Sequence, residues 1–130
     1  MKRKGFTLIE LVVVMAIIAI LSVLVIGAIT VARRTSTETA NRGTAKSIQT
    51  GLEAYYAKNK QYPATSGTVT FDAIVATGGA LNGMVTTQGA QCTGATTYKG
   101  GGTVTYTATG YTLNVANWEC TAVLETISST

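Results

Sequence analysis

The chain has 130 residues, ten cationic and six acidic side chains, two cysteines and no histidine. Without histidine it lacks the commonest general base and the ordinary zinc and iron ligand sets. The acids form no obvious carboxylate pair; they are Glu10, Glu38, Glu53, Asp72, Glu119 and Glu125. The sequence therefore disfavours an enzyme, and we expect no cofactor and no metal.

The positive charge is concentrated at the start of the chain. The formal net charge of +4 falls to +1 when Lys2, Arg3 and Lys4 are left out. The basic isoelectric point is thus mostly a property of the first five residues, and we expect no general affinity for nucleic acid.

An apolar run from Phe6 to about Ala32 carries one charge, Glu10. As a helix it would be about 40 Å long, enough to cross a hydrocarbon layer. The cations before it favour a cytoplasmic N-terminus, although Arg33 and Arg34 at its far end weaken the asymmetry. A cleaved secretory signal is one alternative, but the run is about twice the usual length and holds an acid. A plain signal anchor is the other.

The next segment, residues 33–62, is polar with one apolar stripe. Ala45, Ile48, Leu52 and Tyr55 or Tyr56 recur at helical spacing. Pro63 is the only proline, and the residue before a proline is pushed out of helical geometry. We therefore predict one helix over about residues 6–59, with local weakness at Gly43 and Gly51, each costing about 1 kcal/mol.

Residues 63–130 are predicted to form a small β head. Three runs alternate apolar and polar residues: Val104, Tyr106 and Ala108; Tyr111, Leu113 and Val115; Trp118, Cys120, Ala122 and Leu124. Thr109–Gly110 is interpreted as a tight connection within an antiparallel meander, and Lys99–Thr103 as a flexible approach to it. The helix stripe would cover the buried face of this sheet.

Cys92 and Cys120 both follow the apolar run. In an oxidising compartment they would pair, closing a loop of about 29 residues worth roughly 3.6 kcal/mol in the chain-entropy model. The alternative is two reduced, buried cysteines in a cytosolic head.

The N-terminal stretch "KRKGFTLIELVVVMAIIAI" closely resembles the class III signal of type IV prepilins and pseudopilins. "LEAYYAKNKQYP" is similar to the end of the long pilin helix and the turn after it, and the head resembles the family in its short sheet and C-terminal cysteine pair. The resemblance implies the α+β type IV pilin fold. It also implies a leader, residues 1–5, that a prepilin peptidase cuts between Gly5 and Phe6 before methylating the Phe6 amine.

By the same resemblance, residues 6–32 form the transmembrane and assembly half of the helix. A lone carboxylate in lipid is costly, so Glu10 should pair with the Phe6 amine of a neighbouring subunit. The alternative is that Glu10 lies at the level of the lipid headgroups and only places a negative charge at the start of the helix. Many pilins carry a proline where this chain has Gly27, and we interpret Gly27 as the weak point of the helix.

The expected function is a structural subunit that polymerises into a type IV pilus-like surface filament. Its partners would be copies of itself, prepilin peptidase, the inner-membrane pilus assembly machinery and membrane lipid. It would lie in the inner membrane first and in an extracellular filament afterwards. The alternatives are a pseudopilin of a type II secretion system and a minor DNA-binding competence pilin. The last is disfavoured because Lys99 is the only cation after Pro63.

Overall fold

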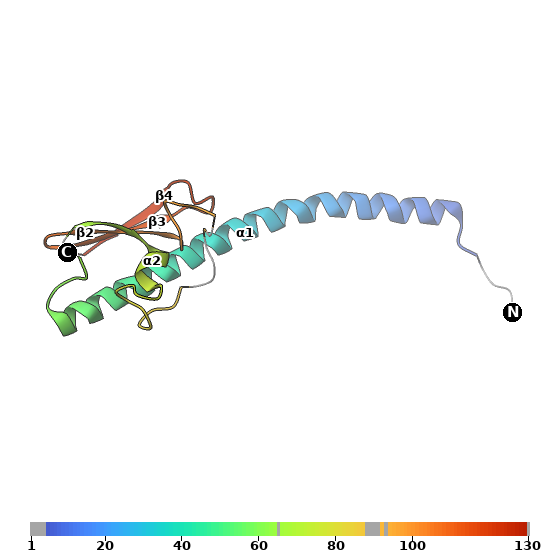
Figure 1. Cartoon of the computed structure of the whole chain (residues 1–130). Coiled ribbons are helices and arrows are strands. Elements are labelled where there is room, and N and C mark those ends of the chain that lie inside the picture. Colours follow the sequence, from blue (N-terminus) through green and yellow to red (C-terminus); the bar gives the residue numbers. More distant parts are fainter. Residues whose placement is uncertain (1–4, 65, 88–91, 93, 130) are drawn as a thin grey trace. The chain divides into compact units, whose positions relative to one another are not determined.

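The structure, a computed structural model, describes residues 5–64, 66–87, 92 and 94–129. Among these residues the elements follow one another in the order α1 (Leu8–Asn59), β1 (Gly67–Thr70), α2 (Phe71–Val75), β2 (Gly102–Thr107), β3 (Gly110–Ala116) and β4 (Val123–Ser128) (Figure 1). The chain divides into two compact units, Met1–Arg34 and Thr35–Thr130. We call them the N-terminal unit and the head, and describe each by itself.

The predicted long helix is confirmed as α1. It begins at Leu8, two residues later than expected, and ends at Asn59 as expected. The next residue, Lys60, has a left-handed φ of 60°, and its N–H donates to the carbonyl oxygen of Tyr56 at 2.7 Å. This is a common way for a helix to satisfy its last carbonyls and stop.

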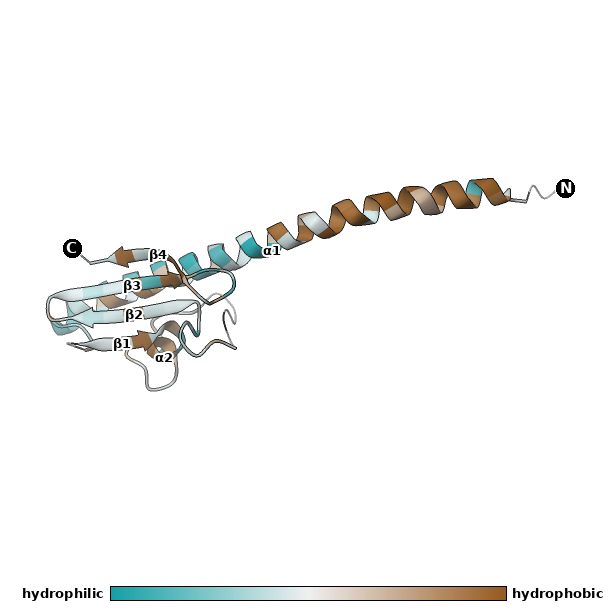
Figure 2. Ribbon diagram, turned by 90° about the horizontal axis from the view of Figure 1, so that it is seen from above, coloured by the Kyte–Doolittle hydropathy of each residue, from teal (hydrophilic) through white to brown (hydrophobic). Residues whose placement is uncertain are grey.

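The sheet is antiparallel, with its strands side by side in the order β1-β2-β3-β4 (Figure 2). The first two strands of the predicted meander are confirmed as β2 and β3, whose register places Val104 opposite Leu113, and β4 pairs with β3 on its other side. The turn between β2 and β3 consists of Ala108 and Thr109, one residue earlier than predicted, because Thr107 already pairs with Gly110.

The core of the head lies between the second half of α1 and one face of the sheet. The helix stripe is confirmed: Ala45, Ile48 and Leu52 are fully buried, and Tyr55 packs at the margin. The period-two pattern is confirmed for β2 and β3, which contribute Val104, Tyr106, Tyr111, Leu113 and Val115.

The prediction for the third alternating run was wrong, because only Leu124 of its four residues lies in a strand. The side-chain oxygen of Asn117 accepts the N–H groups of Thr121 at 3.0 Å and Ala122 at 3.3 Å. These local hydrogen bonds compete with strand pairing and hold a turn before β4. Two elements were also missed, β1 and α2.

The glycines of Lys99–Thr103 are not a flexible approach. Gly101 has a φ of 100°, and a Cβ placed there would meet the side-chain oxygen of Asn41 at 2.5 Å. A Cβ on Gly102 would collide with the carbonyl oxygen of Asn114 and the ring of Phe71. The stretch needs glycine because it packs closely against α1, α2 and β3.

Candidate processing and assembly site

A capping box closes the start of α1. The carboxylate oxygen Oε2 of Glu10 accepts hydrogen bonds from the backbone N–H and the hydroxyl of Thr7, both at 2.8 Å. In return the Glu10 N–H donates to Thr7 Oγ1 at 3.4 Å. Glu10 is therefore held at the helix N-terminus, where unpaired N–H groups favour a negative charge. Thr7 was missed as a functional residue, although the spacing Thr-x-x-Glu is itself a capping signal.

The predicted cleavage position precedes this cap. Gly5 and Phe6 are in neither helix nor strand, and both are exposed. A Cβ on Gly5 would meet nothing within 4 Å, so the chain itself does not require glycine there. The bond between Gly5 and Phe6 is accordingly reachable, and the requirement for a small residue would come from a peptidase.

Phe6 and Glu10 also share one face of the N-terminal unit. Together with Ile9, Val13 and Val14 they line an open groove of about 330 Å³. The groove wall is apolar apart from Glu10. A cation held in this groove would therefore find one acid to pair with and an apolar surround.

The described apolar residues of the N-terminal unit are all exposed. Every described residue from 5 to 36 is exposed, although the helix is apolar over most of this length (Figure 2). By length and composition α1 contains a stretch able to cross a membrane. A soluble monomer rarely leaves so large a patch in water, so this surface needs lipid or other helices around it.

The predicted weak point lies in a stretch that is regular helix in the single chain. Gly27 is inside α1, with open space around it. The Ser22 hydroxyl donates to the Ile18 carbonyl at 2.7 Å, and the Thr30 hydroxyl donates to the Ile26 carbonyl at 3.1 Å. Such back-bonds slightly weaken or bend a helix, so Gly27 lies between two further mild perturbations.

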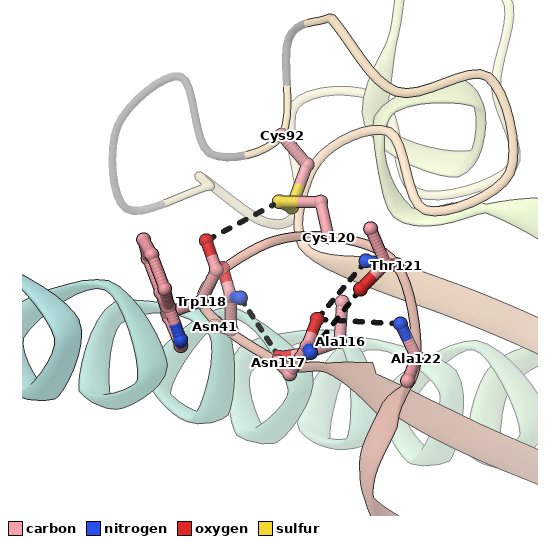
Figure 3. The surroundings of a disulfide bond; sticks show 8 residues. All are labelled: Asn41, Cys92, Ala116, Asn117, Trp118, Cys120, Thr121 and Ala122. Atoms are coloured by element: carbon pink, nitrogen blue, oxygen red, sulfur yellow. Dashed lines mark hydrogen bonds between the residues drawn. A yellow bond between two sulfur atoms is a disulfide. The ribbon is translucent and has the colours of Figure 1, made fainter.

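The predicted disulfide between Cys92 and Cys120 is confirmed, with 5.6 Å between the Cα atoms (Figure 3). Cys120 belongs to the turn that Asn117 organises, before β4. Nearby, the amide nitrogen of Asn41 on α1 donates to the Ala116 carbonyl at 3.0 Å. The bridge therefore closes the end of the head where β3 meets α1.

Ion pairs in the described part of the head include one at Lys99 and one at Arg42. Lys99, the only cation after Pro63, lies 3.2 Å from a carboxylate oxygen of Asp72. Arg42 on α1 lies 3.0 Å from Glu125 on β4. The pairing of Lys99 further weakens the case for a nucleic-acid interface, which needs clustered cations.

Two tyrosines of the core differ in their partners. The hydroxyl of Tyr111 donates to a Glu53 carboxylate oxygen at 2.7 Å, whereas the buried hydroxyl of Tyr106 has no hydrogen-bond partner among the described residues. Burial raises the pKa of Tyr106 to about 12. Burial also raises the pKa of Tyr111, and the adjacent Glu53 carboxylate raises it further.

Residues 1–32 match the prokaryotic N-terminal methylation motif. This segment is the class III signal peptide of type IV pilins and pseudopilins. The match confirms the resemblance noted in the sequence and ends before the head begins. No curated protein and no solved structure was found to match the chain.

The motif supports a type IV pilin-like or pseudopilin protein, and the long apolar helix, the small antiparallel sheet and the disulfide fit the α+β pilin fold. It implies processing by a prepilin peptidase and assembly into a pilus-type filament. Proteins with this motif form a structural family that is not known for catalysis. The apolar helix fits membrane anchoring before assembly.

Proposed function

We propose that this chain is the structural subunit of a type IV pilus-like surface filament. The observation that carries the proposal is an N-terminal unit whose methylation motif coincides with an apolar helix exposed on all sides. Lipid covers this surface before assembly, and the helices of other copies cover it in the fibre. The exchange keeps the apolar side chains out of water throughout.

Cleavage between Gly5 and Phe6 creates the charge that directs assembly. Removal of residues 1–5 gives Phe6 a cationic amine in place of a neutral peptide group. Glu10 then exchanges its Thr7 donors for the Phe6 amine of an adjacent copy, because an ion pair in an apolar surround is stronger than hydrogen bonds from neutral groups. Glu10 would thereby fix the register between stacked helices.

The alternative within the same motif is a pseudopilin of a type II secretion system, which shares the processing and the membrane helix. Deletion of the gene followed by electron microscopy of the cell surface separates the two. The proposal expects fibres to disappear and to return on complementation. Fibres that persist after deletion, together with loss of protein secretion, would contradict it and favour the pseudopilin.

A further inference from the structure

An open cleft of about 310 Å³ lies in the head where the end of α1 and the residues after it meet the β2–β3 turn. Tyr56, Lys60, Gln61 and Tyr62 line one side, and Thr107 and Thr109 line the other. All of these residues belong to the head. The cleft is therefore separate from the processing and assembly site.

A row of tyrosine rings supports this cleft. Tyr56 and Tyr62 stack with their ring centroids 4.8 Å apart and their planes at 28°. Tyr62 in turn meets the buried Tyr111 edge to face at 5.2 Å. Tyr56, at the outer end of the row, is 42% exposed. Rings fixed by such contacts lose little freedom when a ligand stacks on them, so the platform is already organised.

Polar groups stand beside the rings. The left-handed turn at Lys60 fixes the backbone between Tyr56 and Gln61. In the part of the chain that the structure describes, neither the Lys60 ammonium nor the Gln61 amide has a hydrogen bond or ion pair. The residues Thr107 and Thr109 are exposed. Donors and acceptors thus line the same cleft as the aromatic rings.

From this combination we infer that the cleft binds a pyranose ring of a saccharide. One face of a sugar ring presents C–H groups, whose positive hydrogens suit the negative face of tyrosine. Its rim of hydroxyls needs both donors and acceptors, which Gln61 and the two threonines supply. The Lys60 ammonium would repel a cationic ligand, and a single cation would bind a polyanion only weakly. The volume is at the small end for ligand pockets and suits one or two sugar units.

The test uses the full-length chain in micelles of a detergent without a sugar headgroup, so that the detergent does not compete. Saturation-transfer NMR is recorded with the methyl glycosides of glucose, galactose, N-acetylglucosamine and glucuronic acid. We expect transfer to at least one of them, strongest at the C–H protons of one ring face. Tyr56→Ala should weaken binding about tenfold, the size of one aromatic contact. Tyr56→Phe, which keeps the ring, should stay within about twofold.

Two further variants make the result specific to the cleft. Gln61→Ala leaves the rings in place and should weaken binding about fivefold through loss of one hydrogen bond. Trp118→Ala removes an exposed aromatic ring near the disulfide, outside this cleft, and should change nothing. Absence of transfer to all four glycosides would overturn the inference, as would equal losses in Tyr56→Ala and Trp118→Ala. Neither outcome depends on fibre formation, so the proposed function would be untouched.

Discussion

The two halves of α1 differ in how much of their surface they bury within the chain. In the N-terminal unit every described helical residue is exposed, and the helix buries nothing against the rest of its own unit. In the head the same helix buries one stripe, which consists of Asn41, Thr44, Ala45, Ile48, Gly51 and Leu52. The head therefore completes its core from its own chain, whereas the N-terminal unit needs lipid or other copies. Substitutions in one half should accordingly affect folding, and those in the other should affect processing and assembly.

The largest expected effect is on processing. Gly5→Leu should leave the precursor uncut, because a bulky side chain obstructs the close approach of a peptidase to the Gly5–Phe6 bond. The head should fold and form its disulfide as before. Intact-mass measurement of the membrane fraction checks this, with Gly27→Ala as the control glycine substitution. Normal removal of residues 1–5 from the Gly5→Leu chain would contradict the cleavage assignment.

Glu10→Ala should block or strongly slow assembly while leaving insertion and the head intact. The change removes a costly charge from an apolar segment, so insertion should improve if anything. Fibre counts measure assembly, and an assay of the Cys92–Cys120 disulfide in the same cells measures folding of the head. Glu38→Ala, on the same helix but in the head, is the matched control and should assemble normally. Wild-type numbers of fibres from Glu10→Ala cells would rule out the pairing.

A matched pair of substitutions on α1 tests the contrast in burial directly. Leu52→Ala removes a fully buried side chain and should lower the free energy of unfolding of the head by about 2–5 kcal/mol. Val12→Ala removes an exposed side chain in the N-terminal unit and should leave that quantity unchanged. Denaturant titration of the full-length chain in micelles, followed by tyrosine fluorescence, measures both. Equal losses would mean that the two halves do not behave independently.

A smaller effect distinguishes the two core tyrosines. Tyr111→Phe loses the hydrogen bond to the Glu53 carboxylate and should cost about 1.5–3 kcal/mol, the range for a hydrogen bond to a charged group. Tyr106→Phe removes a buried hydroxyl that has no hydrogen-bond partner in the described part of the chain, and should be neutral or stabilising. The same titration gives both values. A loss in Tyr106→Phe as large as that in Tyr111→Phe would show that its hydroxyl is satisfied.

The same two phenols give the head a pH dependence. Both pKa values are raised above the ordinary value of 10, so folding favours the neutral phenol. The contribution of Tyr106 is fully present below pH 10 and is lost as the pH rises through about 12, its pKa, whereas that of Tyr111 persists to higher pH. Thermal unfolding between these pH values should show a falling midpoint. In Tyr106→Phe the fall should be shallower, and an unchanged slope would contradict the assignment.

The smallest expected effect concerns Gly27. We predict that the helix stays closed in the single subunit but opens between about Ser22 and Ile29 in the fibre, which would let fibres lengthen under load. Gly27→Ala stabilises the helix by about 1 kcal/mol and should reduce extensibility under a pulling force. A fibre map with regular helical hydrogen bonding from Leu11 to Ala32 would refute the opening. Gly27→Ala should then change neither yield nor extensibility.

Periodicity predicted the parts of the fold in which one face of an element is buried along its length. The stripe Ala45, Ile48 and Leu52 and the inward residues of β2 and β3 were of this kind. The strand predicted around Trp118 was wrong because the side chain of Asn117 accepts backbone N–H groups that a strand would pair with its neighbour. A period-two pattern of apolar residues contains no information about such local hydrogen bonds. β1 has only four residues, too few for a pattern.

Close packing between segments that are far apart in the sequence could not be predicted either. Gly51 was interpreted only as a helix weakness, yet a Cβ there would meet the Val85 side chain at 2.5 Å and that of Leu81 at 3.1 Å. Gly101 similarly makes room for Asn41. At the candidate site, by contrast, the signal is local, because Thr7 and Glu10 are three residues apart. That is why the methylation motif of the N-terminal unit could be recognised from the sequence, whereas the head could be predicted only in outline.

The most direct test of the central claim is the intact mass of the main protein in surface fibres sheared from the cells. The account predicts a chain that begins at Phe6, carries one additional methyl group on its amine and lacks two hydrogens because Cys92 and Cys120 are joined. A main fibre protein of different sequence, or one that still contains Lys2 to Gly5, would contradict it.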